Sequence, residues 1–228
     1  MKKLLCPILL LGILMSLCAS PVAALPDDPI DRMTFFGEST TSHLALRGGI
    51  DPLRVWSSPS CTMKLDSGIL SRTVTDHATG KPATPAEMAR AYQPEILILS
   101  FGLNGILSFS ERPEAFLRNY RKLIDAVHAA SPKTQIILQA VSPVADEAHQ
   151  TDWKFSVPPQ EINRRLSLLN GEICTFCKSD PDLTFANTAL ALTDPAGFLR
   201  ADLTTDGIHL TAAAYAIILS VLRDTVCE

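Results

Sequence analysis

The sequence lacks an excess of positive charge. Lys and Arg together number 20 against 24 Asp and Glu, which gives a net charge of −4 at pH 7. Proteins that bind nucleic acids usually carry basic patches that neutralise phosphate groups, so this composition argues against a nucleic-acid partner. The negative balance is in turn too small to indicate a partner of opposite charge.

The chain also lacks internal repeats, low-complexity linkers and, beyond its first residues, any apolar run long enough to span a bilayer. Its 228 residues are 46% hydrophobic and 19% charged, which is typical of a globular protein rather than a disordered one. The length fits one compact domain with a substantial core. We therefore expect a signal peptide at residues 1–24 and a single domain at residues 25–228.

The chain begins like an export signal. Lys2 and Lys3 precede a mostly apolar stretch, Leu4–Leu17, and small residues surround a cleavage point after Ala24. A transmembrane helix needs about 20 apolar residues, so a cleaved signal is preferred over an uncleaved anchor. A lipid anchor at Cys18 is the weaker alternative, because Leu17 stands where a small residue is expected. The sequence thus predicts a secreted or cell-envelope protein.

Few cysteines remain after the signal: Cys61, Cys174, Cys177 and Cys227. Export brings them into oxidising conditions, where disulfides can form, but four cysteines allow three pairings and the sequence does not choose among them. Cys174 and Cys177 form a C-x-x-C motif, which suggests redox or zinc chemistry. Because no second such motif and no histidine pair accompany it, a structural role is the preferred interpretation.

Strands and helices alternate along the chain. We expect short strands at residues 33–37, 54–57, 95–101, 134–141 and 183–186, and helices at 85–92, 113–130, 159–176 and 211–223. Residues 63–85 are polar and contain Gly and Pro, which predicts an insertion or a long loop. The alternation is typical of a parallel sheet with helices on both faces, where ligands bind beyond the carboxyl ends of the strands.

Two turns that follow strands carry polar side chains. In Gly37-Glu38-Ser39-Thr40, a serine leads into a helix, where it either acts as a nucleophile or simply caps the helix. In Gly102-Leu103-Asn104-Gly105, the asparagine amide either faces an oxyanion or serves as an ordinary turn residue. Taken singly, each turn favours the structural interpretation.

A third turn, Asp206-Gly207-Ile208-His209, precedes the last helix. A carboxylate beside an imidazole fixes the tautomer of the ring and stabilises its cation, which a general base requires. His43 lies one helical turn beyond Ser39 and is interpreted as a rim or structural residue. The three turns together supply a nucleophile, an oxyanion donor, a base and an orienting carboxylate, a combination that is far less expected by chance than any one of the turns.

These three turns resemble the sequence blocks of the SGNH hydrolase family, also called GDSL-type esterases. Gly37-Glu38-Ser39 is similar to the Gly-Asp-Ser block, Gly102-Leu103-Asn104 matches Gly-x-Asn, and Asp206-Gly207-Ile208-His209 matches Asp-x-x-His. The resemblance spans nearly all of the mature chain. It implies an α/β/α sandwich whose parallel, flavodoxin-like sheet has about five strands, and a serine esterase that needs no metal or cofactor.

The same resemblance assigns roles to individual residues. Ser39 would be the nucleophile, His209 the base and Asp206 its orienting residue, with Gly37, Glu38 and Gly102 in support. The Ser39 N–H and the Asn104 amide would form the oxyanion hole, together with an N–H from a second block.

The chain departs from the family pattern at two places. Glu38 replaces the usual Asp, and the stretch Val55–Thr62 lacks the glycine of the second block, so the N–H of Ser60 or Cys61 is expected to replace the missing donor. Because loss of one oxyanion donor costs about 100- to 1000-fold in rate, these departures suggest a weakened or highly selective enzyme.

By analogy with the family, the expected substrates are small esters or acetylated glycans, with O-acetyl groups on carbohydrate or peptidoglycan first and lipid or thioester acyl chains second. Trp56, Trp153 and Phe155 form a hypothetical sugar platform. Two other classes stay open: a non-catalytic cell-surface binding module that retains the fold, and a thiol redox protein, which would require a thiol of low pKa. The oligomeric state is undetermined.

Overall fold

The computed structural model describes residues 28–151 and 155–227 and contains one five-stranded parallel sheet. The strands are β1 (Met33–Gly37), β2 (Val55–Trp56), β5 (Ile96–Ser100), β6 (Gln135–Gln139) and β7 (Leu183–Ala186). Their order across the sheet is β2-β1-β5-β6-β7. The chain moves from β1 to one side for β2 and then to the other side for β5, so the topological switch point lies between β1 and β5, where sheets of this kind bind ligands.

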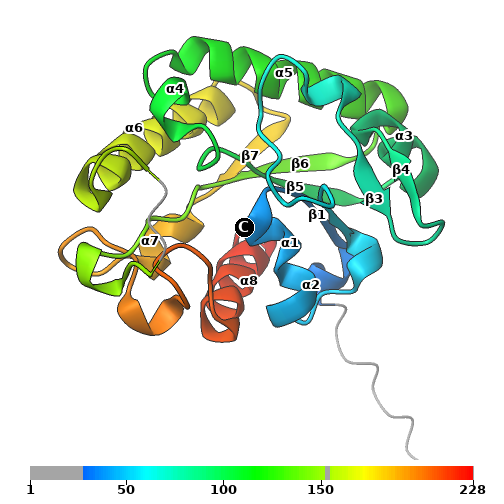
Figure 1. Cartoon of the computed structure of the whole chain (residues 1–228). Coiled ribbons are helices and arrows are strands. Elements are labelled where there is room, and N and C mark those ends of the chain that lie inside the picture. Colours follow the sequence, from blue (N-terminus) through cyan, green and yellow to red (C-terminus); the bar gives the residue numbers. More distant parts are fainter. Residues whose placement is uncertain (1–27, 152–154, 228) are drawn as a thin grey trace, which may run out of the picture.

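Helices cover both faces of the sheet (Figure 1). One face carries α3 (Pro85–Tyr92), α4 (Ile106–Phe109), α5 (Pro113–Ala130) and α6 (Pro159–Lys178). The other carries α1 (Ser39–Ser42), α2 (Leu44–Arg47), α7 (Thr188–Leu192) and α8 (Ala212–Cys227). Short 3-10 helices occupy Pro29–Arg32, Pro52–Arg54, Ile69–Ser71, Glu147–His149 and Ala201–Leu203. The structure confirms the predicted α/β/α sandwich.

The strand β5 shows how the sequence builds the two layers. Leu97 and Leu99 pack into the cluster that includes residues of α3, α5 and α6, whereas Ile96 and Ile98 pack into the cluster that includes residues of α8. Alternate side chains of a strand point to opposite faces, so an unbroken apolar run fills both cores. This is why the continuous run predicted a strand buried on both sides.

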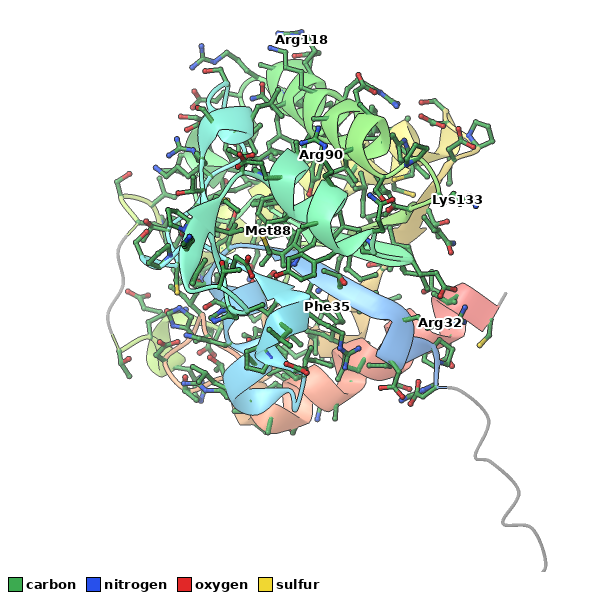
Figure 2. The ribbon with its side chains drawn as sticks, turned by 90° about the vertical axis from the view of Figure 1, so that its right-hand side faces the viewer. Arg32, Phe35, Met88, Arg90, Arg118 and Lys133 are labelled. Carbon is green, nitrogen blue, oxygen red and sulfur yellow. The ribbon has the colours of Figure 1, made fainter. Side chains whose placement is uncertain are left out.

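The helix α5 presents one apolar face to the sheet. Its apolar residues recur at steps of three and four, as expected for an amphipathic helix, and all are buried: Phe116, Tyr120, Leu123, Ile124 and Val127. Figure 2 shows Arg118 projecting outward from the same helix, while Met88 on α3 and Phe35 on β1 are buried. The exposed face of the layer is therefore charged and its inner face apolar.

Residues 63–85 differ from the expected loop. The segment forms an antiparallel pair, β3 (Val74–Asp76) with β4 (Lys81–Ala83), and it buries Met63, Leu65 and Ile69. These apolar residues lie among polar ones without a helical or strand period, so the sequence pattern concealed their contribution to the core. The last helix also continues beyond the predicted end, as far as Cys227.

Within residues 28–151 and 155–227, Cys61, Cys174, Cys177 and Cys227 form no disulfide with one another. Cys177 is buried, and burial raises the pKa of its thiol to about 12. Thiol redox catalysis needs a low pKa, so the structural interpretation of the C-x-x-C motif is the better one.

None of the helices in the described part of the chain combines the length and the apolar character that crossing a bilayer requires. The predicted signal peptide lies outside the described residues.

A pair of glycine substitutions tests the packing at the end of β1. A Cβ added at Gly37 would lie 2.2 Å from Thr41 Oγ1 and 2.4 Å from the carbonyl oxygen of Ser100. We expect Gly37→Ala to lower the free energy of unfolding by about 1–3 kcal/mol, because the backbone of β5 has to shift. Gly171 in α6 has open space around the same position, so Gly171→Ala is expected to raise the free energy of unfolding by about 0.5–1 kcal/mol. Urea unfolding of both variants measures the difference, and equal effects would contradict the packing argument.

Candidate active site

Ser39 lies at the switch point of the sheet. β1 ends at Gly37 and α1 begins at Ser39, so only Glu38 separates the strand from the helix. The N–H groups of the first helical turn have no partner within the helix, which leaves the Ser39 N–H available to an incoming oxygen atom. The Ser39 residue is partly exposed. The structure thus gives this serine the position that the turn sequence predicted.

Glu38 joins the first turn to the second. Its side chain is buried, and its two carboxylate oxygens accept hydrogen bonds from the N–H groups of Gly102, at 2.7 Å, and Asn104, at 2.9 Å. Burial raises the pKa of Glu38 to about 7, although these N–H groups and the charge of Lys64 oppose the rise. The family pattern has a shorter Asp at this position, and the extra methylene of Glu38 still reaches both N–H groups.

Asn104 is fixed at both its backbone and its side chain. Besides the bond to Glu38, its Nδ2 donates to the carbonyl oxygen of Met63 at 3.3 Å. A primary amide carries two hydrogens, so one stays available to a ligand. Gly102 and Gly105, on either side, have φ angles of 150° and 118°, which L residues with a Cβ rarely adopt. The turn therefore depends on its two glycines to present the amide.

Asp206 and His209 are in direct contact. Asp206 Oδ2 lies 2.6 Å from His209 Nδ1, and Oδ1 accepts the N–H groups of Ile208 and His209 at 3.0 and 2.7 Å. Burial acts to raise the pKa of Asp206, but the hydrogen bonds from the His209 ring and from the two backbone N–H groups bring it below its ordinary value. The carboxylate therefore stays ionised and holds the ring so that Nε2 is the nitrogen free to act as a base.

Residues that the sequence did not single out hold this loop in place. Gln150 Nε2 donates to the carbonyl oxygens of Ala145, at 2.7 Å, and Gly207, at 3.3 Å. The guanidinium of Arg47 on α2 donates to the carbonyl oxygen of Leu210 at 2.8 Å. These partners are distant in the sequence and belong to no motif, so no sequence signal could have identified them.

His43 contacts both the turn that carries Ser39 and the ring of His209. The N–H of His43 donates to the carbonyl oxygen of Ser39 at 3.0 Å, and its ring lies against the His209 ring with centroids 4.8 Å apart. Within the described parts of the chain, no hydrogen bond joins Ser39 directly to His209. His43, interpreted from the sequence as a rim or structural residue, thus contacts the His209 ring.

Cys61 does not present its N–H as expected. This group donates to the carbonyl oxygen of Ser58 at 2.9 Å, inside a turn, and is not free to bind an oxyanion. The φ angle of Cys61 is 55°, in the left-handed region that favours glycine. Its Sγ lies 3.0 Å from Ser42 Oγ on α1. The geometry thus argues against Cys61 as the third oxyanion donor.

The hollows around the site are small. One, lined by residues that include Glu38, Gly102 and Ile208, has a volume of about 10 Å³, and a second beside Thr40 has the same volume. A larger cavity of about 640 Å³ lies between α6 and α7, and neither Ser39 nor His209 lines it.

The expected sugar platform is not formed as a unit. Trp56 is 1% exposed and belongs to the core, Phe155 packs against the same core, and Trp153 lies outside the described residues.

Among the residues that the structure describes, no group of three or more His, Cys, Asp or Glu side chains is arranged to hold a metal ion.

Comparison with known proteins gives a match over most of the chain. The model of a family described as the GDSL-like Lipase/Acylhydrolase family matches residues 35–217. A comparison with curated protein sequences finds no match.

Several solved structures share the fold at low sequence identity. A Streptococcus pneumonia protein provisionally described as a platelet activating factor is 19% identical, with a TM-score of 0.60, over 90% of this chain and 86% of its own. A carbohydrate esterase of family 3 from Talaromyces cellulolyticus is 15% identical, with a TM-score of 0.55, over 86% of this chain and 95% of its own. A GDSL-like lipase from Bacteroides thetaiotaomicron is 15% identical, with a TM-score of 0.52, over 88% and 90% of the two chains. At these identities the likeness concerns the fold.

Titration of Glu38 gives a pH-dependent prediction. A carboxyl group whose pKa rises from 4.5 to about 7 on folding keeps a proton that the unfolded chain has released, so stability falls as the pH rises between these values. We expect the wild type to lose up to about 3 kcal/mol relative to Glu38→Gln, which cannot titrate, between pH 4.5 and pH 7.5. Denaturant unfolding at several pH values measures the difference. Parallel curves for the two proteins would show that Glu38 does not titrate in this range.

Proposed function

The chain belongs to the GDSL-like lipase/acylhydrolase family and is a serine ester hydrolase, and from this premise we propose that Ser39, His209 and Asp206 are its catalytic triad. The observation that carries the assignment is the pair of Asp206 and His209, whose 2.6 Å contact leaves His209 Nε2 to act as a base. Ser39 starts a helix at the switch point of the sheet, and His43 connects its turn to the His209 ring.

The reaction then follows the acyl-enzyme route. His209 Nε2 removes the Ser39 proton as Ser39 Oγ attacks the ester carbonyl, and Asp206 stabilises the imidazolium cation that forms. The same proton passes to the departing alcohol. Water, deprotonated by His209, next attacks the acyl-enzyme, and Ser39 recovers its proton as the acid leaves.

Two donors support the proposed oxyanion hole. The N–H of Ser39 stands at the start of α1, and Asn104 Nδ2 keeps one hydrogen beyond the one it gives to Met63. Fixed donors aimed at developing charge usually contribute the largest part of catalysis. Because the Cys61 N–H is bonded to Ser58, Ser39 and Asn104 are the two donors on which the proposal depends.

For the substrate, we propose O-acetyl esters of carbohydrate or peptidoglycan. The two hollows beside the serine turn, which Thr40 lines and Ser39 does not, hold about 10 Å³ each. This is about the volume of a single water-sized probe, so neither hollow has space for a long acyl chain. A structure described as a carbohydrate esterase and another described as an acetyl esterase share the fold.

Lipid or thioester acyl chains are the second candidate. A binding module without catalysis is the third, and it draws support only from the altered second block at Cys61.

An ester series tests the function. With the chain from Leu25 onward, we expect nitrophenyl acetate to be hydrolysed at a rate that falls as the acyl chain lengthens to octanoate, because the site has little room. Ser39→Ala is expected to lower kcat by at least about 1000-fold.

One control variant and two contradicting outcomes complete the test with the ester series. Ser108→Ala, a serine of α4 outside the proposed site, controls for a general effect of losing a hydroxyl. Hydrolysis that survives Ser39→Ala would reject the nucleophile, and faster cleavage of octanoate than of acetate would reject the acetyl preference.

Export is proposed on the sequence of the N-terminus alone. Lys2 and Lys3 followed by an apolar stretch support a signal that is cleaved after Ala24 and delivers the enzyme to the cell envelope or the medium. Mass spectrometry of the protein from an expressing bacterial culture is expected to find Leu25 as the first residue. A chain that keeps Met1 and fractionates with membranes would indicate an uncleaved anchor instead.

A further inference from the structure

We propose that His43 is a positioning residue for the proposed base: its ring packs on the His209 ring and holds the imidazole in the orientation that Asp206 sets. The inference rests on the proposed function, in which His209 is the base. It adds a residue that lies outside the three sequence blocks and that touches neither the ester nor the oxyanion.

The contact is placed to restrict rotation of His209. The two ring centroids are 4.8 Å apart with the planes tilted by 55°, a distance typical of packed rings. Asp206 binds the His209 ring through Nδ1, and this one hydrogen bond leaves the ring free to swing about that point. The packing of the His43 ring against the His209 ring restricts this motion.

His43 is also attached to the nucleophile turn. It lies at the junction of α1 and α2, and its N–H donates to the carbonyl oxygen of Ser39 at 3.0 Å. The His43 ring therefore moves with the turn that carries Ser39. This links the position of the nucleophile to the position of the base even though the two residues come from opposite ends of the chain.

One polar atom of the His43 side chain, Nδ1, lacks a hydrogen-bond partner among the described residues. This nitrogen is buried. A buried unpartnered polar atom costs stability, but the packing role proposed for His43 uses the ring and not this nitrogen. Phenylalanine therefore provides a control, because it keeps the packing and removes the unpartnered nitrogen.

The charged and titratable groups that act on His43 are His209, Arg47 and Asp206. Burial lowers the pKa of His43, the charges of His209 and Arg47 lower it further, and Asp206 opposes them. At neutral pH the ring is therefore uncharged, and His209 can take up a proton without a second cation against it. In acid, protonation of His43 places a cation beside the ring of the proposed base.

Steady-state kinetics over pH 4.5–9 with Ser39-dependent ester hydrolysis test the proposal. We expect His43→Ala to lower kcat by about 10- to 100-fold with KM within about 2-fold of the wild type, because the base is misplaced while substrate binding is not. His43→Phe is expected to recover kcat to within about 3-fold of the wild type, because the ring packing returns.

The acid limb of the kcat/KM profile should be steeper in the wild type than in His43→Phe, which has lost one titrating group. The exposed His77 provides a matched control in His77→Ala, which should behave like the wild type.

An NMR titration gives a readout that does not depend on activity. The pKa of His43 is held down in part by His209, so His209→Phe should move the titration of the His43 ring signals to higher pH. Replacing the exposed His77 should leave that titration unchanged.

The outcomes separate the two proposals. If Ser39→Ala has no effect on hydrolysis, the proposed function fails, and the NMR coupling alone decides whether the two rings interact. If hydrolysis needs Ser39 but His43→Ala keeps its kcat, the positioning role is wrong. It is also wrong if His43→Phe is as slow as His43→Ala, or if His209→Phe leaves the His43 titration unmoved.

Discussion

The hydrogen bonds that Glu38 accepts are the constraint on which the rest of the site depends. They join the end of β1, which carries Ser39, to the turn after β5, which carries Asn104. A carboxylate is expensive to bury unless its oxygens are hydrogen-bonded, and here both oxygens accept a backbone N–H. The close approach of the two strand ends adds to this, because Gly37 leaves no room for a Cβ against Ser100. The proposed nucleophile and oxyanion donor are thereby fixed to each other through the buried Glu38 carboxylate and the backbone N–H groups that it binds.

The proposed base, His209, is held by contacts of another kind than those that fix the turns of Ser39 and Asn104. Asp206 and His209 lie on a loop between short elements, so the regular bonds of a helix or strand cannot fix them. Instead, Gln150 binds the carbonyl oxygen of Gly207, and Arg47 binds that of Leu210. The ring of His43 adds a tilted contact with the ring of His209. The two halves of the site therefore combine a rigid sheet edge with a loop that is tied down from several directions, which is a common arrangement for catalytic residues.

Much of this architecture could be read from local sequence patterns. The unbroken apolar run of β5 and the three- and four-residue steps of α5 each report burial directly, and two of the three polar turns follow directly from the strands β1 and β5. Residues 63–85 could not be read in this way, because Met63 and Leu65 pack irregularly among polar neighbours. Trp56 looked like a surface aromatic, but β2 pairs with β1 and carries it into the core. Contacts such as that of Arg47 with Leu210 join residues far apart in the chain, and single-sequence patterns do not encode them.

Cys61 shows how a substituted position can keep the shape of the residue it replaces while losing its function. Its φ of 55° is a conformation that glycine adopts freely and that strains a residue with a side chain. The contact of Cys61 Sγ with Ser42 Oγ joins this segment to α1. The N–H of Cys61, however, closes a turn with the carbonyl oxygen of Ser58. An oxyanion hole works through donors that are already in place, and an N–H that is already bonded is a poor donor. The proposed oxyanion hole therefore depends mainly on Ser39 and Asn104, and the hydrogen bonds of Glu38 fix the turns that carry both residues.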